Sequence, residues 1–241
     1  MWYYSPTFFS LAGQLLGLGS VAPFFYFLCF AFGPTASELS RSPVQNRTVR
    51  QGVSGLLLPI VFLFHTAEVF AMFLAPEYTT RHFWTWAWQL SPFWIGITHL
   101  VLSKTIARPQ AASKASSSTL ATPLKTLLLV LGTTSAAVWG YTLVFSPHSL
   151  PTIFLPAWEP QTEFVAHCRT ALQADNLAVF GSSLLWLVYS SFDLYTAGLL
   201  GGDWILHVLL LPVITAFAGS GAALVFGWYL REKALASPTK K

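Results

Sequence analysis

The sequence predicts an all-α fold, a polytopic transmembrane helix bundle with six to seven membrane helices, and three observations support this prediction. Of the 241 residues, 54% are hydrophobic and only 9% are charged, whereas soluble domains contain about 25% charged residues. The mean hydropathy is +0.57. The apolar residues gather in segments of roughly 20–27 residues, the length that a helix needs to cross a bilayer. We therefore expect one transmembrane domain over residues 1–241, integral to a membrane, with the endoplasmic reticulum as its expected location.

Six apolar segments are predicted to form the membrane helices. They cover residues 7–32, 54–75, 83–103, 124–145, 176–199 and 204–230. Four of them contain a proline, which predicts kinks that neighbouring helices must accommodate by satisfying the freed backbone groups. These prolines are Pro23, Pro59, Pro92 and Pro212.

Two connections differ in composition from the apolar segments. Residues from about 104 to 123 are small, serine-rich and basic, which predicts a flexible cytoplasmic loop. Residues from about 146 to 175 contain four prolines and several charges, which predicts a polar loop that re-enters the membrane or lies on it. This second loop is also where a seventh membrane element is expected, if there is one.

The basic residues raise a question about topology. They cluster in the first loop, in the third loop and in the C-terminal tail, and such clusters usually mark the cytoplasmic face. Six crossings would place the tail on the face opposite to both loops, whereas five or seven crossings would place all three clusters together. The sequence leaves these alternatives open.

Glu68 stands out because it lies deep within the apolar segment 54–75. An acidic residue there costs roughly 2.5–3.5 kcal/mol on insertion scales, so intramembrane acids usually have a function. Helical spacing places His65 and Met72 on the same face as Glu68, with Phe64 at its border. Either these residues perform proton chemistry, or Glu68 makes a buried hydrogen bond or ion pair between helices.

A second acid, Asp193, shares a predicted helix face with Trp186 and Tyr189. Aromatic faces attract cations by about 0.5–2 kcal/mol each. This face therefore either binds a positively charged species, or packs in the core with Asp193 near the membrane surface. Asp203 is predicted to be a helix N-cap, and His207, one turn later, faces either the core or a cavity.

The third apolar segment begins with several tryptophans, of which Trp88 precedes Gln89. An interfacial aromatic belt explains such a run, although Trp88 and Gln89 could also line the interior. The sequence contains no GxGxxG, Walker A, GxSxG, HExxH or aspartate-rich diphosphate-binding motif. We therefore expect no cofactor and no metal. A nucleic-acid partner is also not expected, because no basic stripe alternates with exposed aromatic residues.

An acid in an apolar, aromatic environment suits the protonation of a lipophilic alkene or epoxide, followed by carbocation cyclisation. The sequences HTAEVF around Glu68 and SSFDLY around Asp193 resemble the acid-bearing positions of small integral-membrane terpene cyclases from fungal meroterpenoid pathways, of the ascochlorin and ascofuranone type. This resemblance implies a metal-independent, class II-type cyclase that acts on a prenylated aromatic with a terminal epoxide. The expected partners are this lipophilic substrate and membrane lipid.

Ten residues make up the candidate site. The candidate catalytic residues are Glu68, Asp193 and His65, and the candidate substrate-binding residues are Trp186, Tyr189, Phe64, Met72, Gln89, Trp88 and His207. Two other functions remain open. The chain also resembles the emopamil-binding sterol isomerases, which use a His and a Glu on one helix, and a proton-coupled transporter could use Glu68 and Asp193 as proton relays.

Overall fold

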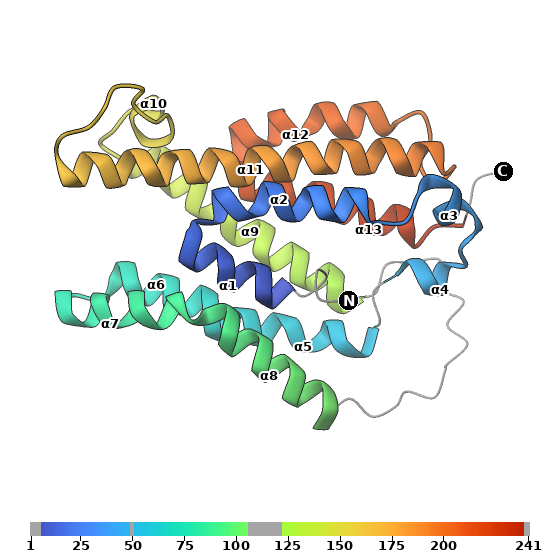
Figure 1. Cartoon of the computed structure of the whole chain (residues 1–241), viewed down its shortest axis with the longest axis horizontal. Coiled ribbons are helices and arrows are strands. Elements are labelled where there is room, and N and C mark those ends of the chain that lie inside the picture. The colour runs from blue at the N-terminus through green and yellow to red at the C-terminus, as the bar shows by residue number, and fades with distance from the viewer. Residues whose placement is uncertain (1–5, 49–50, 106–121, 239–241) are drawn as a thin grey trace.

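The computed structural model describes residues 6–48, 51–105 and 122–238, and within these ranges all helices and turns belong to one helical bundle without a strand (Figure 1). The first half contains α1 (Pro6–Leu16), α2 (Leu18–Ala31), α3 (Ala36–Arg41), α4 (Val44–Arg47), α5 (Gln51–Val61), the π-helix η2 (Phe62–Thr66) and α6 (Ala67–Leu74). The second half contains α7 (Tyr78–Gln89), α8 (Ser91–Thr105), α9 (Thr122–Phe145), α10 (Leu150–Phe154), α11 (Phe164–Thr196), α12 (Trp204–Ala218) and α13 (Ser220–Leu235).

Three helices of the described residues are long and apolar enough to cross a membrane. They are Gly55–Leu74, Thr122–Phe145 and Phe164–Thr196. The expectation of six to seven membrane helices is thus met only in part, because each of the other three apolar segments is broken into two shorter helices. Many large apolar side chains lie exposed on the outer faces of the bundle, such as Leu15, Phe73 and Phe217, as contact with lipid would require.

Backbone conformation at two glycines explains two of these breaks. Gly17 separates α1 from α2 with φ 86°, and Gly219 separates α12 from α13 with φ 87°. Residues with a side chain rarely adopt such positive φ values, whereas glycine does so readily, which permits the chain to reverse there. Leu211 and Gly227, each eight residues from Gly219, lie in contact. The predicted segment 204–230 is therefore a helical hairpin and not one crossing.

The third break separates α7 from α8 at Leu90, and Pro92 follows in the first turn of α8. Proline is well tolerated in a first helical turn because that N–H has no intrahelical partner. The expected kink at Pro92 is thus a helix boundary. Pro59 lies in α5 shortly before η2, where the wider π-turn adds a residue to the helix that carries Glu68.

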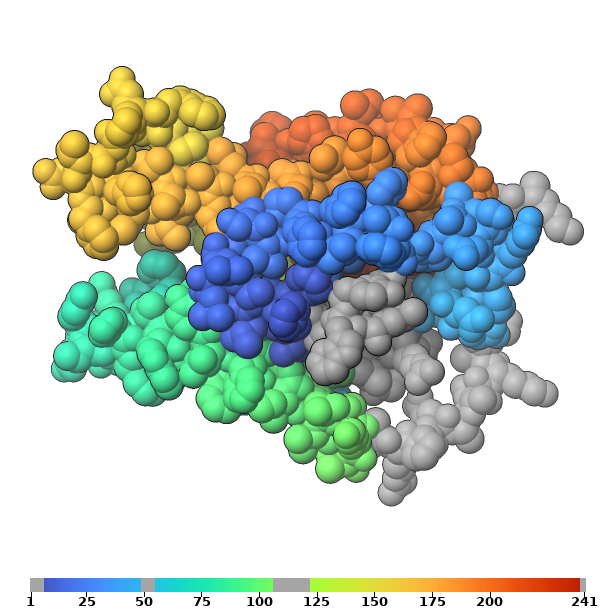
Figure 2. Space-filling view, viewed as in Figure 1, coloured from blue at the N-terminus to red at the C-terminus, as the bar shows by residue number. Residues whose placement is uncertain are grey.

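The helices α2 and α11 run parallel and lie side by side. Gly19 contacts Asp175 at one end, and Tyr26 contacts Ser183 about two turns later. The backbones approach closely, because a Cβ at position 19 would lie 2.7 Å from the Asp175 Cα. In space-filling view, α1 and α2 fill the face between α11 and the α7–α8 pair (Figure 2).

The prediction of a polar loop over residues 146–175 is wrong for its second half, because α11 begins at Phe164. The first half contains the short helix α10, which the buried Gln173 side chain ties to α11. Its Nε2 donates to the carbonyls of Thr152 and Ile153 at 2.8 and 2.9 Å. The other expected loop, about 104–123, falls mainly on residues 106–121, which lie outside the described part of the chain.

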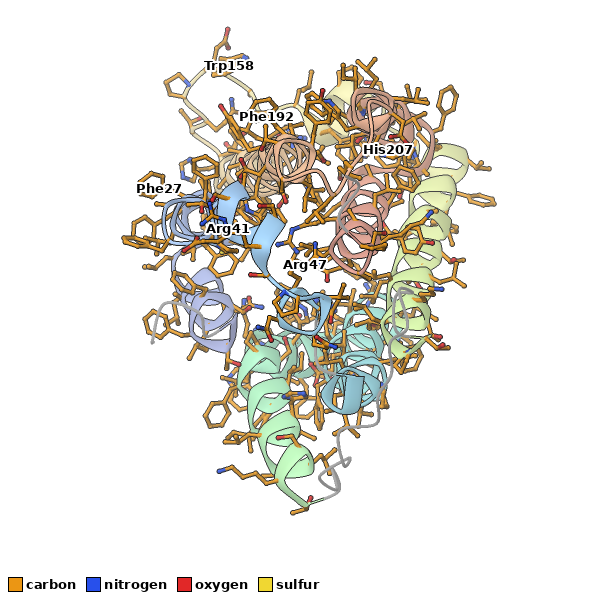
Figure 3. The ribbon with its side chains drawn as sticks, turned by 90° about the vertical axis from the view of Figure 1, so that its right-hand side faces the viewer. Phe27, Arg41, Arg47, Trp158, Phe192 and His207 are labelled. Carbon is orange, nitrogen blue, oxygen red and sulfur yellow. The ribbon has the colours of Figure 1, made fainter. Side chains whose placement is uncertain are left out.

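Arg41 and Arg47 of the first loop lie at the end of the bundle that faces the viewer in Figure 3. Arg47 donates from Nη2 to the carbonyl of Ser237 at 3.2 Å, so the first loop adjoins the C-terminal end of α13. Pro123 lies close to Gly55, so α9 begins where the membrane part of α5 begins. The reversals at Gly17 and Gly219 add a change of direction to two of the predicted segments, so the number of apolar segments does not equal the number of crossings.

Candidate functional site

Glu68 is the second residue of α6 and directly follows the π-turn η2. Only 7% of its surface is exposed, and its Oε2 atom has no hydrogen-bond partner. Buried polar groups are normally paired, because an unpaired one loses its hydration without compensation. A buried carboxyl oxygen without a partner therefore indicates either a ligand site or a strained contact.

His65 does not supply the missing partner. Its side chain is exposed, whereas Glu68 is buried, so the π-turn separates two residues that α-helical spacing would place on one face. The His65 ring instead meets the Trp88 ring edge-on, with centroids 6.3 Å apart. The prediction that His65 and Glu68 share one helix face was thus wrong.

Two further buried polar atoms of this half of the bundle also lack partners. They are Nε1 of Trp88 in α7 and Nε2 of His99 in α8. Together with Glu68 Oε2 they come from three consecutive helices, of which α6 and α8 pack against η2, while α7 meets it through the rings of Trp88 and His65. Three unpaired polar groups among α6, α7 and α8 make this half of the bundle the better candidate for binding a polar group within an apolar ligand.

Asp193 lies in the last turn of α11, far from Glu68. It lines a small pocket of about 60 Å³ together with Trp186, Ser190 and Arg231. In Figure 1, α6 and the C-terminal end of α11 lie at opposite ends of the long axis. The structure therefore does not bring the two acids together. A liquid-like water occupies about 30 Å³, so this pocket has room for water and not for a prenyl chain.

Arg231 organises the pocket that contains Asp193. Its Nη1 donates to Glu232 Oε1 at 2.6 Å, and its Nε donates to Ser190 Oγ at 3.0 Å. The guanidinium carbon lies 5.1 Å from the centre of the Trp186 ring. Glu232 is 5% exposed as a side chain. The result is an ion pair near the C-terminal end of α13, held by an aromatic ring and a hydroxyl.

This arrangement leaves Trp186 little free surface for a substrate. Besides Arg231, its ring contacts Tyr26 in a stacked geometry at 5.2 Å and Trp228 at 5.3 Å. Tyr189 differs, since it is exposed and contacts Phe30 at 5.5 Å. Of the two aromatic rings expected to bind a cation on α11, the Trp186 ring thus already contacts a cation of the protein itself, the Arg231 guanidinium.

The remaining candidate residues are scattered. Phe64 and Met72 are half-buried on η2 and α6, and Gln89 is exposed at the end of α7. His207 lies 3.8 Å from Asp203 through its Nε2 atom, and its Nδ1 atom is buried without a partner. Asp203 occupies the N-cap position of α12, but its side chain makes no capping hydrogen bond.

Sequence reasoning missed Arg231 and Glu232 because they follow directly on the apolar segment 204–230 and were grouped with the basic tail. The signal was the adjacency of an Arg and a Glu of opposite charge, which follow Trp228 and Tyr229 within about one helical turn. Among the described residues, no three His, Cys, Asp or Glu side chains lie close enough to hold a metal ion.

The fold and the site define a helical bundle with a lipid-compatible exterior and two separate polar interiors. A family model, the CtvD domain, matches residues 1–236, and the chain therefore belongs to the CtvD-domain family. Two curated relatives are FAD-dependent monooxygenases. The protein verC1 of Penicillium polonicum is 29% identical over 239 residues, which cover 98% of this chain and 29% of the relative. The protein anuJ of Penicillium roqueforti (strain FM164) is 26% identical over 231 residues, which cover 93% of this chain and 28% of the relative.

The chain thus spans less than a third of the length of either relative, and no solved structure matches it. The described residues of this chain do not form a Rossmann-type site for the flavin in the relatives' names. Dinucleotide sites of the Rossmann type need a strand, a glycine-rich turn and a helix. The described ranges form helices without strands, and the sequence has no GxGxxG.

Proposed function

We propose that this chain is an integral-membrane terpene cyclase, which protonates a terminal epoxide or alkene of a prenylated aromatic and guides the cyclisation that follows. Glu68 is the proton donor. The observation that carries the proposal is the buried Glu68 Oε2 without a partner. General acid catalysis needs a positioned acid within an environment that excludes water. The buried position of Glu68 in α6 suits this requirement.

The relatives support an oxygenated substrate. Both are named FAD-dependent monooxygenases, and flavin monooxygenases transfer one oxygen atom from O₂ to an organic substrate. An epoxide is one product of such a transfer to an alkene. A segment of about 240 residues that recurs in these proteins suits a following step on the oxygenated product.

The proposed step conserves atoms. The Glu68 carboxyl O–H bond breaks as its proton passes to the epoxide oxygen, and the C–O bond at the more substituted carbon breaks. The electron pair of a neighbouring alkene forms a new C–C bond, and the final cation loses a proton to a base. The product is a hydroxylated ring isomer of the substrate.

The test compares two glutamates that lie nine residues apart. Microsomes that contain the unmodified chain, Glu68→Gln or Glu77→Gln receive a farnesylated phenol with a terminal epoxide. Glu77 is exposed at the start of α7, so its substitution controls for the loss of one charge. Glu68→Gln should lower turnover by about 10²–10⁴, the usual contribution of a general acid, while Glu77→Gln retains it. Full turnover by Glu68→Gln at normal abundance would refute the assignment.

The same assay separates this proposal from the other functions. A panel of epoxidised prenyl aromatics and sterols distinguishes cyclisation from sterol isomerisation, because only the former forms a new ring. Uptake into proteoliposomes under a pH gradient, without product formation, would instead indicate a transporter.

A further inference from the structure

A long apolar groove lies on the outer surface between α9 and α13, away from both polar interiors. Its volume is about 550 Å³, and its lining includes Lys125, Leu129 and Ala136 of α9 and Val225 and Tyr229 of α13. Concave sites of about 300–1,000 Å³ are large enough for an organic ligand. The groove therefore has the size of a binding site, and none of its lining residues belongs to the proposed catalytic group.

The two helices that form the groove run antiparallel. Gly132 opposes Val225, since a Cβ at position 132 would lie 3.2 Å from the Val225 Cγ1 atom. Gly221 lies against Ser135, one turn further along α9. This register places Tyr229 toward the Lys125 end of the groove, so that its two most polar groups share one end.

The length of the groove matches one leaflet of a bilayer. Ala136 follows Lys125 by eleven residues, which is about 16 Å along an α-helix. The hydrocarbon core of a bilayer is about 30 Å thick, so one leaflet measures about 15 Å. Lys125 lies in the first turn of α9, a helix long enough to cross the membrane. The groove thus extends from the membrane surface to about the midplane.

Charge favours a particular lipid at this end. Lys125 is exposed, and the start of α9 lies beside the start of α5, toward the end of the bundle that carries α4 with Arg47 (Figure 1). Two buried nitrogen atoms of Arg47, Nε and Nη1, have no hydrogen-bond partner, and none of the described residues that line the groove is acidic. Each basic residue near a membrane surface contributes about 1 kcal/mol to the attraction of anionic lipid.

We propose that the groove binds one anionic phospholipid, with the phosphate at Lys125 and one acyl chain between α9 and α13. The lipid fills the apolar channel that the two helices leave open, and its phosphate lies beside the Tyr229 end of the groove. The site is independent of the proposed proton chemistry at Glu68, so either proposal can fail without the other.

The test uses native mass spectrometry of the full chain in mild detergent, with equal amounts of phosphatidylglycerol and phosphatidylcholine. The unmodified chain should retain phosphatidylglycerol preferentially. Lys125→Gln should reduce this preference about fivefold, the factor that corresponds to one lysine. Thr133→Phe, which places a ring in the groove from an exposed lining position, should reduce the binding of both lipids. Ala136→Leu serves the same purpose if Thr133→Phe does not fold.

Lys104→Gln is the matched control, because Lys104 is exposed at the end of α8 and does not line the groove. It should retain the lipid preference. An equal loss in Lys104→Gln and Lys125→Gln would overturn the proposal, since it would show a diffuse charge effect. Undiminished lipid in both groove-filling variants would also overturn it. So would a loss of turnover in these variants without a loss of lipid, which would identify the groove as a substrate entrance.

Discussion

Substitution of Asp175 by alanine should destabilise the protein by breaking a contact between α2 and α11. Asp175 Oδ1 accepts a hydrogen bond from the Gly19 backbone N–H at 2.6 Å. Gly19 is the second residue of α2, and the N-cap residue Gly17 has no side chain that could satisfy the free N–H groups. The carboxylate of one helix thus caps another helix, which local sequence rules would not predict.

The expected cost follows from two contributions of this contact. Loss of an N-cap side chain costs about 0.5–2 kcal/mol, and a hydrogen bond to a charged group contributes about 1.5–3 kcal/mol. The contact is only partly buried, so we expect about 2 kcal/mol for Asp175→Ala. In a chain of this size, each kcal/mol lowers Tm by about 2–4 °C, which gives a decrease of about 4–8 °C.

Two further variants make the measurement specific. Asp175→Asn keeps a carbonyl acceptor but loses the charge, and should cost only the charge–dipole part, about 0.3–1 kcal/mol. Asp203→Ala is the control, because Asp203 is an N-cap residue whose side chain makes no capping hydrogen bond. It should stay within about 0.5 kcal/mol of the unmodified chain. Thermal unfolding in detergent, followed by tryptophan fluorescence, measures all three. Equal Tm values for Asp175→Ala and Asp203→Ala would refute the reasoning.

Two other predictions concern charged residues outside the Glu68 group. Arg231→Met should lower the free energy of unfolding by about 3–5 kcal/mol, because it leaves the buried Glu232 without its partner. The double variant with Glu232→Leu should recover most of that loss. A double variant that is less stable in thermal unfolding than Arg231→Met would contradict this. Hydrogen bonds from the Thr35 backbone and hydroxyl hold the pKa of Glu38 below its ordinary value. The capping box of α3 should therefore be complete above about pH 4.3, the ordinary pKa of glutamate, and should be lost as the pH falls through the lowered pKa of Glu38. Titration of the Thr35 amide chemical shift measures this loss. A Thr35 amide chemical shift that stays constant down to pH 2 would show that the contact does not form.

Hydropathy located the helices whose apolar run has no break. The predicted segments 54–75 and 124–145 correspond closely to the long helices Gly55–Leu74 and Thr122–Phe145. The predicted segments 7–32 and 204–230 failed, because the sum of side-chain hydropathies does not register a backbone reversal. Glycine permits positive φ but also occurs within helices, so Gly17 and Gly219 could be recognised as reversals only from their tertiary surroundings.

The candidate site shows the same division between local and long-range information. The burial of Glu68 followed from its apolar neighbours in sequence, and the structure confirms it. The separation of His65 from Glu68 did not follow, because it depends on the π-turn. Asp175 shows the limit most clearly. Asp175 directly precedes the predicted segment 176–199, where it reads as a local N-cap, whereas its partner Gly19 is 156 residues away in sequence.

Charge decides which of the two polar interiors suits a carbocation. In the Asp193 pocket, the guanidinium of Arg231 is fixed over Trp186 at 5.1 Å. A second positive charge about 5 Å from that guanidinium would meet a repulsion of about 3 kcal/mol at an effective dielectric constant of 20, of which the paired Glu232 carboxylate offsets a part. The pocket of about 60 Å³ is also too small for a prenyl chain. Around Glu68, the unpaired atoms come from a carboxyl group, an indole and an imidazole, and none of these groups is a permanent cation. A cation that forms next to Glu68 is stabilised by the carboxylate left after proton transfer, and this asymmetry favours Glu68 over Asp193 as the proton donor.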